Sequence, residues 1–123
     1  VVVDGLDTAH DRLLLQDSAG RLGIPMVHGA LAGFEGRIMT VLPGDAGVKL
    51  LYGDAADRAD PDRPEAVLGV PAVTAALIGT LQAMEVLKIL LGRGSIFRNV
   101  MAYVDLEKGR LDTFRFGESP GKT

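Results

Sequence analysis

The residues whose types and spacing could do chemistry lie near the start of the chain. Three valines at positions 1–3 run directly into Asp4 and Asp7, two carboxylates separated by a glycine and a leucine. A continuous apolar run is typical of a strand covered on both faces, as in parallel α/β sheets. Ligands of such sheets gather at the carboxyl ends of the strands. The stretch therefore predicts a buried strand that carries Asp4 and Asp7 to a functional edge of the sheet.

Asp7 and Thr8 also have a local structural interpretation. Asp, Ser and Thr are preferred helix N-caps, and Thr8 and Asp11 have the spacing of a capping box. We therefore expect a helix to begin here and to end at Gly23. A capping role and a role in chemistry are compatible, and the pattern alone leaves both open.

The later segments predict the elements that position these residues. A strand over 26–31 follows the first helix through a right-handed crossover and pairs in parallel with the first strand. Apolar periodicity and turn residues then predict strands at 37–42 and 48–52, a crossover loop over 53–65, a helix over 71–91, and a hairpin of strands 100–105 and 111–116. The expected fold class is α/β with a mixed parallel and antiparallel sheet and packed helices. We expect one domain over 1–116 and a flexible tail over 117–123.

The helix over 71–91 is long and apolar enough to raise the question of a membrane. Gln82, Glu85 and Lys88 recur at i, i+3 and i+6, which places three polar groups in one arc. A charged arc is costly in lipid, so we expect no membrane span but a core helix whose polar arc meets solvent. Gly79 is expected to allow close approach to the sheet.

His28 is the only histidine on a predicted strand, and its neighbours are apolar residues or glycine. Neither a second histidine nor a serine nucleophile lies near it in the sequence, as a catalytic set would require. The pattern favours a histidine of the core over a catalytic residue.

Composition excludes several classes of protein. The net charge of −3 and an aromatic content of 5% argue against a nucleic-acid partner. The sequence has no cysteine, which excludes disulfides, thiolate metal ligands and a cysteine nucleophile. The absence of cysteine leads us to expect a reducing, cytoplasmic setting. We also expect no signal peptide, because no basic segment with a cleavage site opens the chain.

Several motifs in a fixed order resemble one protein family. They are Asp4-Gly5-Leu6-Asp7 with Arg12, Leu22-Gly23-Ile24-Pro25, Gly33-Phe34-Glu35-Gly36, Leu42-Pro43-Gly44, and Gln82-Ala83-Met84-Glu85 with Lys88. Together they resemble the ThiF/MoeB/HesA group, relatives of the ubiquitin-activating enzymes that adenylate the C-terminus of ubiquitin-like or sulfur-carrier proteins. The resemblance covers nearly the whole chain and matches the C-terminal half of the family's Rossmann-like fold.

The resemblance also implies the site. Asp7 falls on the family's Asp-Asn position, where the aspartate serves ATP and magnesium, and Thr8 replaces the asparagine. Arg12 matches the arginine five residues later, so the implied nucleotide-binding residues are Asp7, Thr8 and Arg12, with Asp7 at the magnesium. Val48 and Leu51 occupy the family's zinc-binding Cys-x-x-Cys position, so no zinc is expected. The family's glycine-rich phosphate loop lies upstream of the matched part.

Two functions from different classes follow. In the first, the chain is part of an ATP-dependent adenylyltransferase that activates a ubiquitin-like or sulfur-carrier protein, and it is inactive when isolated. In the second, it is a non-catalytic scaffold or dimerisation module of the same fold. A truncated sheet exposes an edge, so we also expect a homo-oligomer or association with the missing half, through the strand edge or the apolar helix.

Overall fold

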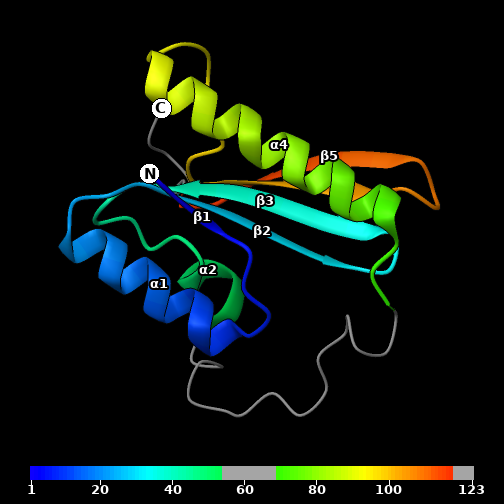
Figure 1. Ribbon diagram of the computed structural model, residues 1–123, viewed down its shortest axis with the longest axis horizontal. Coiled ribbons are helices and arrows are strands. Elements are labelled where there is room, and N and C mark those ends of the chain that lie inside the picture. The colour runs from blue at the N-terminus through cyan, green and yellow to red at the C-terminus, as the bar shows by residue number, and fades with distance from the viewer. Residues whose placement is uncertain (54–68, 118–123) are drawn as a thin grey trace.

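The computed structural model describes residues 1–53 and 69–117, and within them a five-stranded sheet with helices on both faces (Figure 1). The strands are β1 (Val2–Asp4), β2 (Met26–Ala32), β3 (Glu35–Val41), β4 (Val100–Asp105) and β5 (Arg110–Arg115), in the spatial order β1-β2-β3-β4-β5. The helices are α1 (Ala9–Arg21), α2 (Lys49–Tyr52) and α4 (Ala72–Leu91). The predicted crossover loop beyond Gly53 and the predicted tail beyond Gly117 lie outside the described residues.

The strand pairing confirms the predicted mixed sheet. β1 runs parallel to β2, and Asp4 lies opposite His28 in that pair. The pairs β2 with β3, β3 with β4, and β4 with β5 are all antiparallel. Because the β1 to β2 connection passes through α1, the carboxyl end of β1 opens toward the start of that helix, where Thr8 caps α1 by accepting the Asp11 N–H at 3.1 Å.

Alternate residues of β3 supply two separate cores. Met39 and Val41 pack under α1 and α2, in a cluster that includes Met26 and Val48. Ile38 points to the opposite face, where it packs with Ile78 of α4 and with Val104. The period of two along a strand therefore divides the molecule into three layers, with α1 and α2 on one side of the sheet and α4 on the other (Figure 1).

Two predictions about local structure are wrong. The first strand is not covered on both faces, because Val3 is 50% exposed while Asp4, on the other face, is fully buried. The predicted strand over 48–52 is the short helix α2. Its start is fixed by Gln16, which accepts the Val48 N–H at 2.7 Å, and by Gly47, whose φ of +54° turns the chain.

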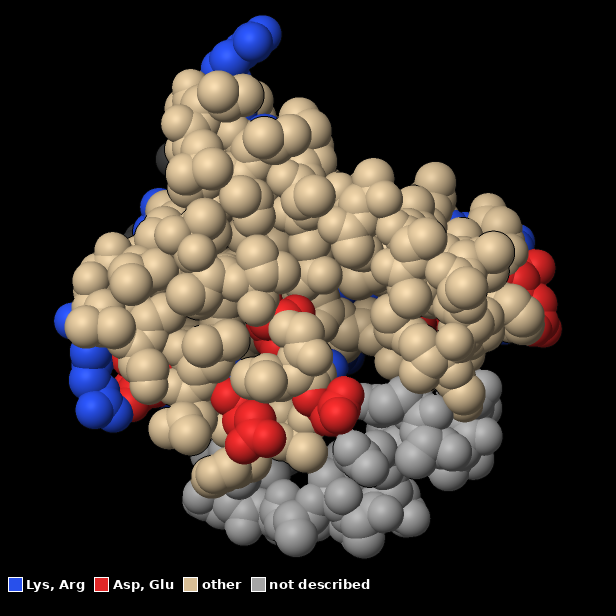
Figure 2. Space-filling view, in the orientation of Figure 1, with Lys and Arg blue, Asp and Glu red and all other residues tan. Residues whose placement is uncertain are grey.

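The predicted orientation of the long helix is also wrong. Gln82 and Glu85 are buried against the sheet and Lys88 is largely covered, so the polar arc faces inward. The exposed residues of α4 are Ala72, Val73, Ala76, Gly79, Thr80, Ala83, Met84, Leu87, Leu90 and Leu91, none of which is charged. Figure 2 shows the surface over this helix as a broad area without charge. Among the described residues, α4 is the one helix that meets the length and composition criteria of a membrane span.

Hydrogen bonds explain why the polar arc faces inward. Glu85 accepts the Thr40 hydroxyl at 2.6 Å and the Phe97 N–H at 2.9 Å, and it pairs with Lys88. Gln82 donates to the backbone carbonyl of Asp4 at 2.9 Å. These side chains supply partners to backbone and hydroxyl groups that would otherwise be buried without one.

The glycines that allow close packing are on the sheet, and not in the helix as predicted. A Cβ atom at Gly29 would overlap the Gln82 side chain, and one at Gly36 would lie 2.6 Å from Ile78. A Cβ atom at Gly79 would meet no atom within 4 Å. The close approach of α4 therefore depends on Gly29 and Gly36.

Candidate functional site

A cavity of about 200 Å³ opens at the carboxyl end of β1, between the start of α1 and the middle of α4. Two of the three predicted nucleotide-binding residues, Asp7 and Arg12, line it. Thr8 is not among the lining residues, and its hydroxyl oxygen caps α1. Ligand pockets are usually about 300–1,000 Å³, so the described residues form a cavity too small for a whole nucleotide.

Asp4 lies at the back of this cavity and is fully buried. One carboxylate oxygen accepts the Leu6 N–H at 2.9 Å, and the other lies 2.6 Å from Nδ1 of His28. Nε of Arg12 lies 3.4 Å from that second oxygen. Both oxygens of Asp4 are thus occupied inside the protein. Asp7 also lines the cavity and is exposed.

His28 is a fully buried residue of the core, as the sequence predicts. Burial lowers the pKa of His28 below its ordinary value, and the hydrogen bond to Asp4 opposes this shift only in part. The ring is therefore neutral at pH 7, and its Nδ1–H donates to the Asp4 carboxylate. The positive charges of the nearby Arg37 and Arg12 guanidinium groups also lower the pKa of His28.

Arg12 is held by the protein on two sides. Its guanidinium donates to the Leu6 carbonyl at 2.6 Å and to the Tyr52 hydroxyl at 2.9 Å. Arg37 from β3 donates to the same hydroxyl and lies over the Tyr52 ring, with 5.0 Å from its guanidinium carbon to the ring centroid. The helix α2 is therefore tied to the site through one tyrosine.

Sequence reasoning missed Tyr52, Arg37 and Gln82 at this site. The pairing of Asp4 with His28 follows from the parallel register of β1 and β2, once that register is known. Gln82 is 78 positions from Asp4, and no local pattern links the two. Tyr52 belongs to a segment that was predicted as a strand and is a helix, so the prediction could not place its side chain at the site.

The described residues contain no group of three or more His, Asp or Glu side chains that could hold a metal ion by themselves. Mg²⁺ in phosphate-transfer sites is usually bound by one or two carboxylates together with the phosphates of the substrate. Asp7 at the cavity fits that mode. It does not form a metal site without a nucleotide.

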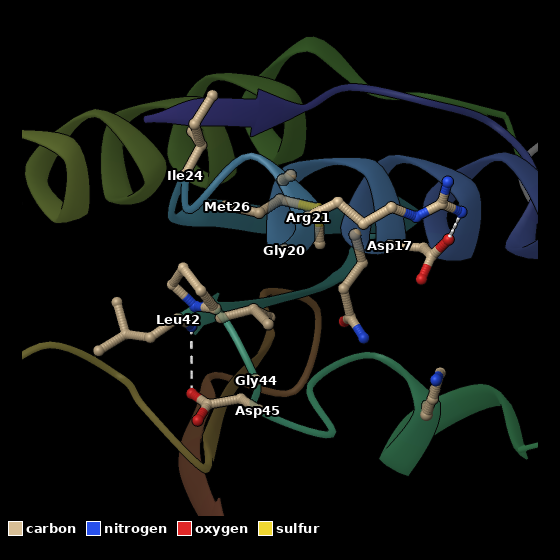
Figure 3. Close-up of a pocket in the computed structure, with 13 residues that line it drawn as sticks. Asp17, Gly20, Arg21, Ile24, Met26, Leu42, Gly44 and Asp45 are labelled. Atoms are coloured by element: carbon tan, nitrogen blue, oxygen red, sulfur yellow. Dashed lines mark hydrogen bonds and ion pairs between the residues drawn. The ribbon is translucent and has the colours of Figure 1, made fainter.

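A second cavity, of about 350 Å³, lies between α1 and the turn that follows β3 (Figure 3). Its lining includes the apolar side chains of Met26 and Ile24 and the ion pair of Asp17 with Arg21. Asp45 accepts two hydrogen bonds from Arg98, which hold the pKa of this carboxyl below its usual range. Both carboxylates pair with arginines of the same chain, and none of the three predicted nucleotide-binding residues lines this cavity.

Comparison with known proteins identifies the family. The model of the ThiF family matches residues 1–122. The chain belongs to the ThiF family. This ThiF-family chain is 33% identical over 121 residues to the SAMP-activating enzyme E1 of Haloferax volcanii, covering 98% of the chain and 44% of that protein. It is 36% identical over 105 residues to the sulfur carrier protein adenylyltransferase of Thermus thermophilus, covering 76% of the chain and 36% of that protein.

Solved structures confirm the fold. The crystal structure of E. coli MccB with ATP superposes with a TM-score of 0.70 at 14% identity, covering 98% of the chain and 37% of MccB. At that identity the likeness shows the fold alone, a Rossmann-type arrangement shared with this ThiF-family chain. The chain spans less than half the length of these relatives.

Proposed function

We propose that this chain is part of an ATP-dependent adenylyltransferase that activates the C-terminus of a ubiquitin-like or sulfur-carrier protein. The observation that supports this most is the cavity at the carboxyl end of β1, which has Asp7 at its exposed side and a fully occupied Asp4 behind it. The family match and the names of the relatives supply the class of reaction.

In the proposed reaction, a carboxylate oxygen of the carrier protein attacks the α-phosphorus of ATP. The bond from that phosphorus to the bridging oxygen breaks, and pyrophosphate leaves. Asp7 would hold magnesium on the triphosphate, and a bound Mg²⁺ would supply charge stabilisation there. Arg12 keeps the loop before Asp7 in place through the Leu6 carbonyl, and Thr8 orients α1 by capping it.

The described part of the site is too small to act alone, and this gives a direct test. We expect calorimetry to show no micromolar binding of Mg·ATP to residues 1–123, because the cavity has a volume of only about 200 Å³ and lacks a phosphate-cradling loop. A longer protein with a glycine-rich loop upstream should bind Mg·ATP and exchange pyrophosphate. Micromolar binding to the 123-residue chain would contradict the proposal.

The exposed face of α4 favours a second function, association of two copies. Residues 73, 76, 80, 83, 87 and 90 follow the 3-4 spacing of a helix-packing seam and are all exposed and uncharged. An uncharged face packs on its own copy without opposing like charges. We propose that a second copy of this chain covers it.

Sedimentation at micromolar concentration tests this association. The unsubstituted chain should sediment as a dimer, and Leu87→Glu should weaken the dimer by at least about a hundredfold, because it would bury unpaired charge at the seam. Leu14→Glu is the control, since Leu14 is similarly exposed but lies on α1. A monomeric unsubstituted chain, or equal weakening by both variants, would rule out the α4 interface.

A further inference from the structure

A continuous series of contacts links His28 to the backbone that carries Asp7. Nδ1 of His28 lies 2.6 Å from one oxygen of Asp4, and the other oxygen accepts the Leu6 N–H at 2.9 Å. The carbonyl of Leu6 accepts a hydrogen bond from Arg12 at 2.6 Å. The peptide groups on both sides of Leu6 are therefore held by buried side chains, and Asp7 is the next residue.

The charges around His28 favour the neutral form of its ring. Asp4 from β1, Arg12 from α1, Arg37 from β3 and Tyr52 from α2 surround the ring. The Asp4 carboxylate already pairs with Arg12, and the charges of Arg37 and Arg12 both disfavour a positive ring, so a protonated His28 would add a further buried positive charge. The neutral ring donates from Nδ1 to Asp4. Its Nε2 has no hydrogen-bond partner among the described residues.

We propose that His28 is a positioning residue of the candidate site, which acts by holding Asp4 so that the Leu6 peptide and the Asp7 carboxylate face the cavity. The role in catalysis rests on the adenylyl transfer proposed above. His28 is fully buried and contacts Asp4 rather than the exposed side of the cavity, so it acts through Asp4 and not on a substrate.

Asparagine and leucine form a matched pair of substitutions at this position. In His28→Asn the side-chain amide nitrogen stands where Nδ1 stood and still donates, whereas His28→Leu has nearly the same shape as asparagine but no donor. Hydrogen exchange of the Leu6 amide, measured on this chain without nucleotide, reports positioning directly. We expect His28→Asn to keep the protection of this amide and His28→Leu to reduce it by about tenfold or more.

If His28→Leu does not fold, His28→Ser replaces it, because the serine hydroxyl is too short to reach Asp4. Equal protection of the Leu6 amide in the variants with and without a donor would overturn the proposal. This measurement does not depend on any enzymatic activity, so it separates the proposal from the proposed function.

A double-mutant cycle on the complete protein tests the link to Asp7. We expect His28→Leu to raise the KM for Mg·ATP in pyrophosphate exchange by about tenfold, and His28→Asn to stay close to the unsubstituted protein. In an Asp7→Ala background the effect of His28→Leu should disappear, because the two residues act on one interaction. Additive effects would overturn the proposal. A complete protein without any pyrophosphate exchange would overturn the proposed function, while the Leu6 amide would still report the positioning.

Discussion

Replacing Glu85 by alanine is expected to lower the free energy of unfolding by about 3–5 kcal/mol, the usual cost of removing one partner of a buried ion pair. Glu85 is 1% exposed, and its carboxylate is shared by Lys88, Thr40 and the backbone of Phe97. Its loss leaves the Thr40 hydroxyl and the Phe97 N–H without this acceptor, and the Lys88 ammonium with the Ser95 carbonyl but no counter-charge at this position. The midpoint of thermal unfolding, followed by circular dichroism, should fall by roughly 10 °C or more.

Two further variants isolate the cause of this loss. Met84→Ala changes the preceding residue, which is about half exposed, and should alter stability by less than about 0.5 kcal/mol. Glu85→Gln keeps the shape and an acceptor oxygen, so it should cost less than Glu85→Ala. If Glu85→Ala were as mild as Met84→Ala, the inward polar arc would have no structural role.

The same helix shows where prediction from the sequence stops. The bounds of α4 follow from Pro71, the apolar run and Gly92, and the structure confirms them. The spacing of Gln82, Glu85 and Lys88 correctly indicates that they share one arc. It does not say which side the arc faces, because that depends on partners such as Thr40 and the backbone of Phe97, which come from distant parts of the chain.

For the candidate site, the sequence likewise predicted the position but not the role of each residue. The apolar run before Asp4 and the cap at Thr8 correctly place a strand end beside a helix start. A carboxylate at that edge follows from sheet geometry. The separate roles of Asp4 and Asp7 do not follow, because only the parallel register puts His28 against Asp4 and occupies that carboxylate.

The largest expected effect on activity is that of Asp7→Asn in the complete protein. Asparagine keeps the shape but removes the charge that would hold magnesium against the triphosphate, so kcat/KM for pyrophosphate exchange should fall by at least about a hundredfold. Stability should change little, because Asp7 is exposed and the cap of α1 is Thr8.

Asp11→Asn is the control, because Asp11 is an exposed acid in the first turn of the same helix but does not line the cavity. It experiences the same helix terminus, so exchange within about twofold of the unsubstituted protein would attribute the loss to the position of Asp7 and not to general electrostatics. Equal losses in the two variants, or full activity of Asp7→Asn, would remove Asp7 from the proposed magnesium site.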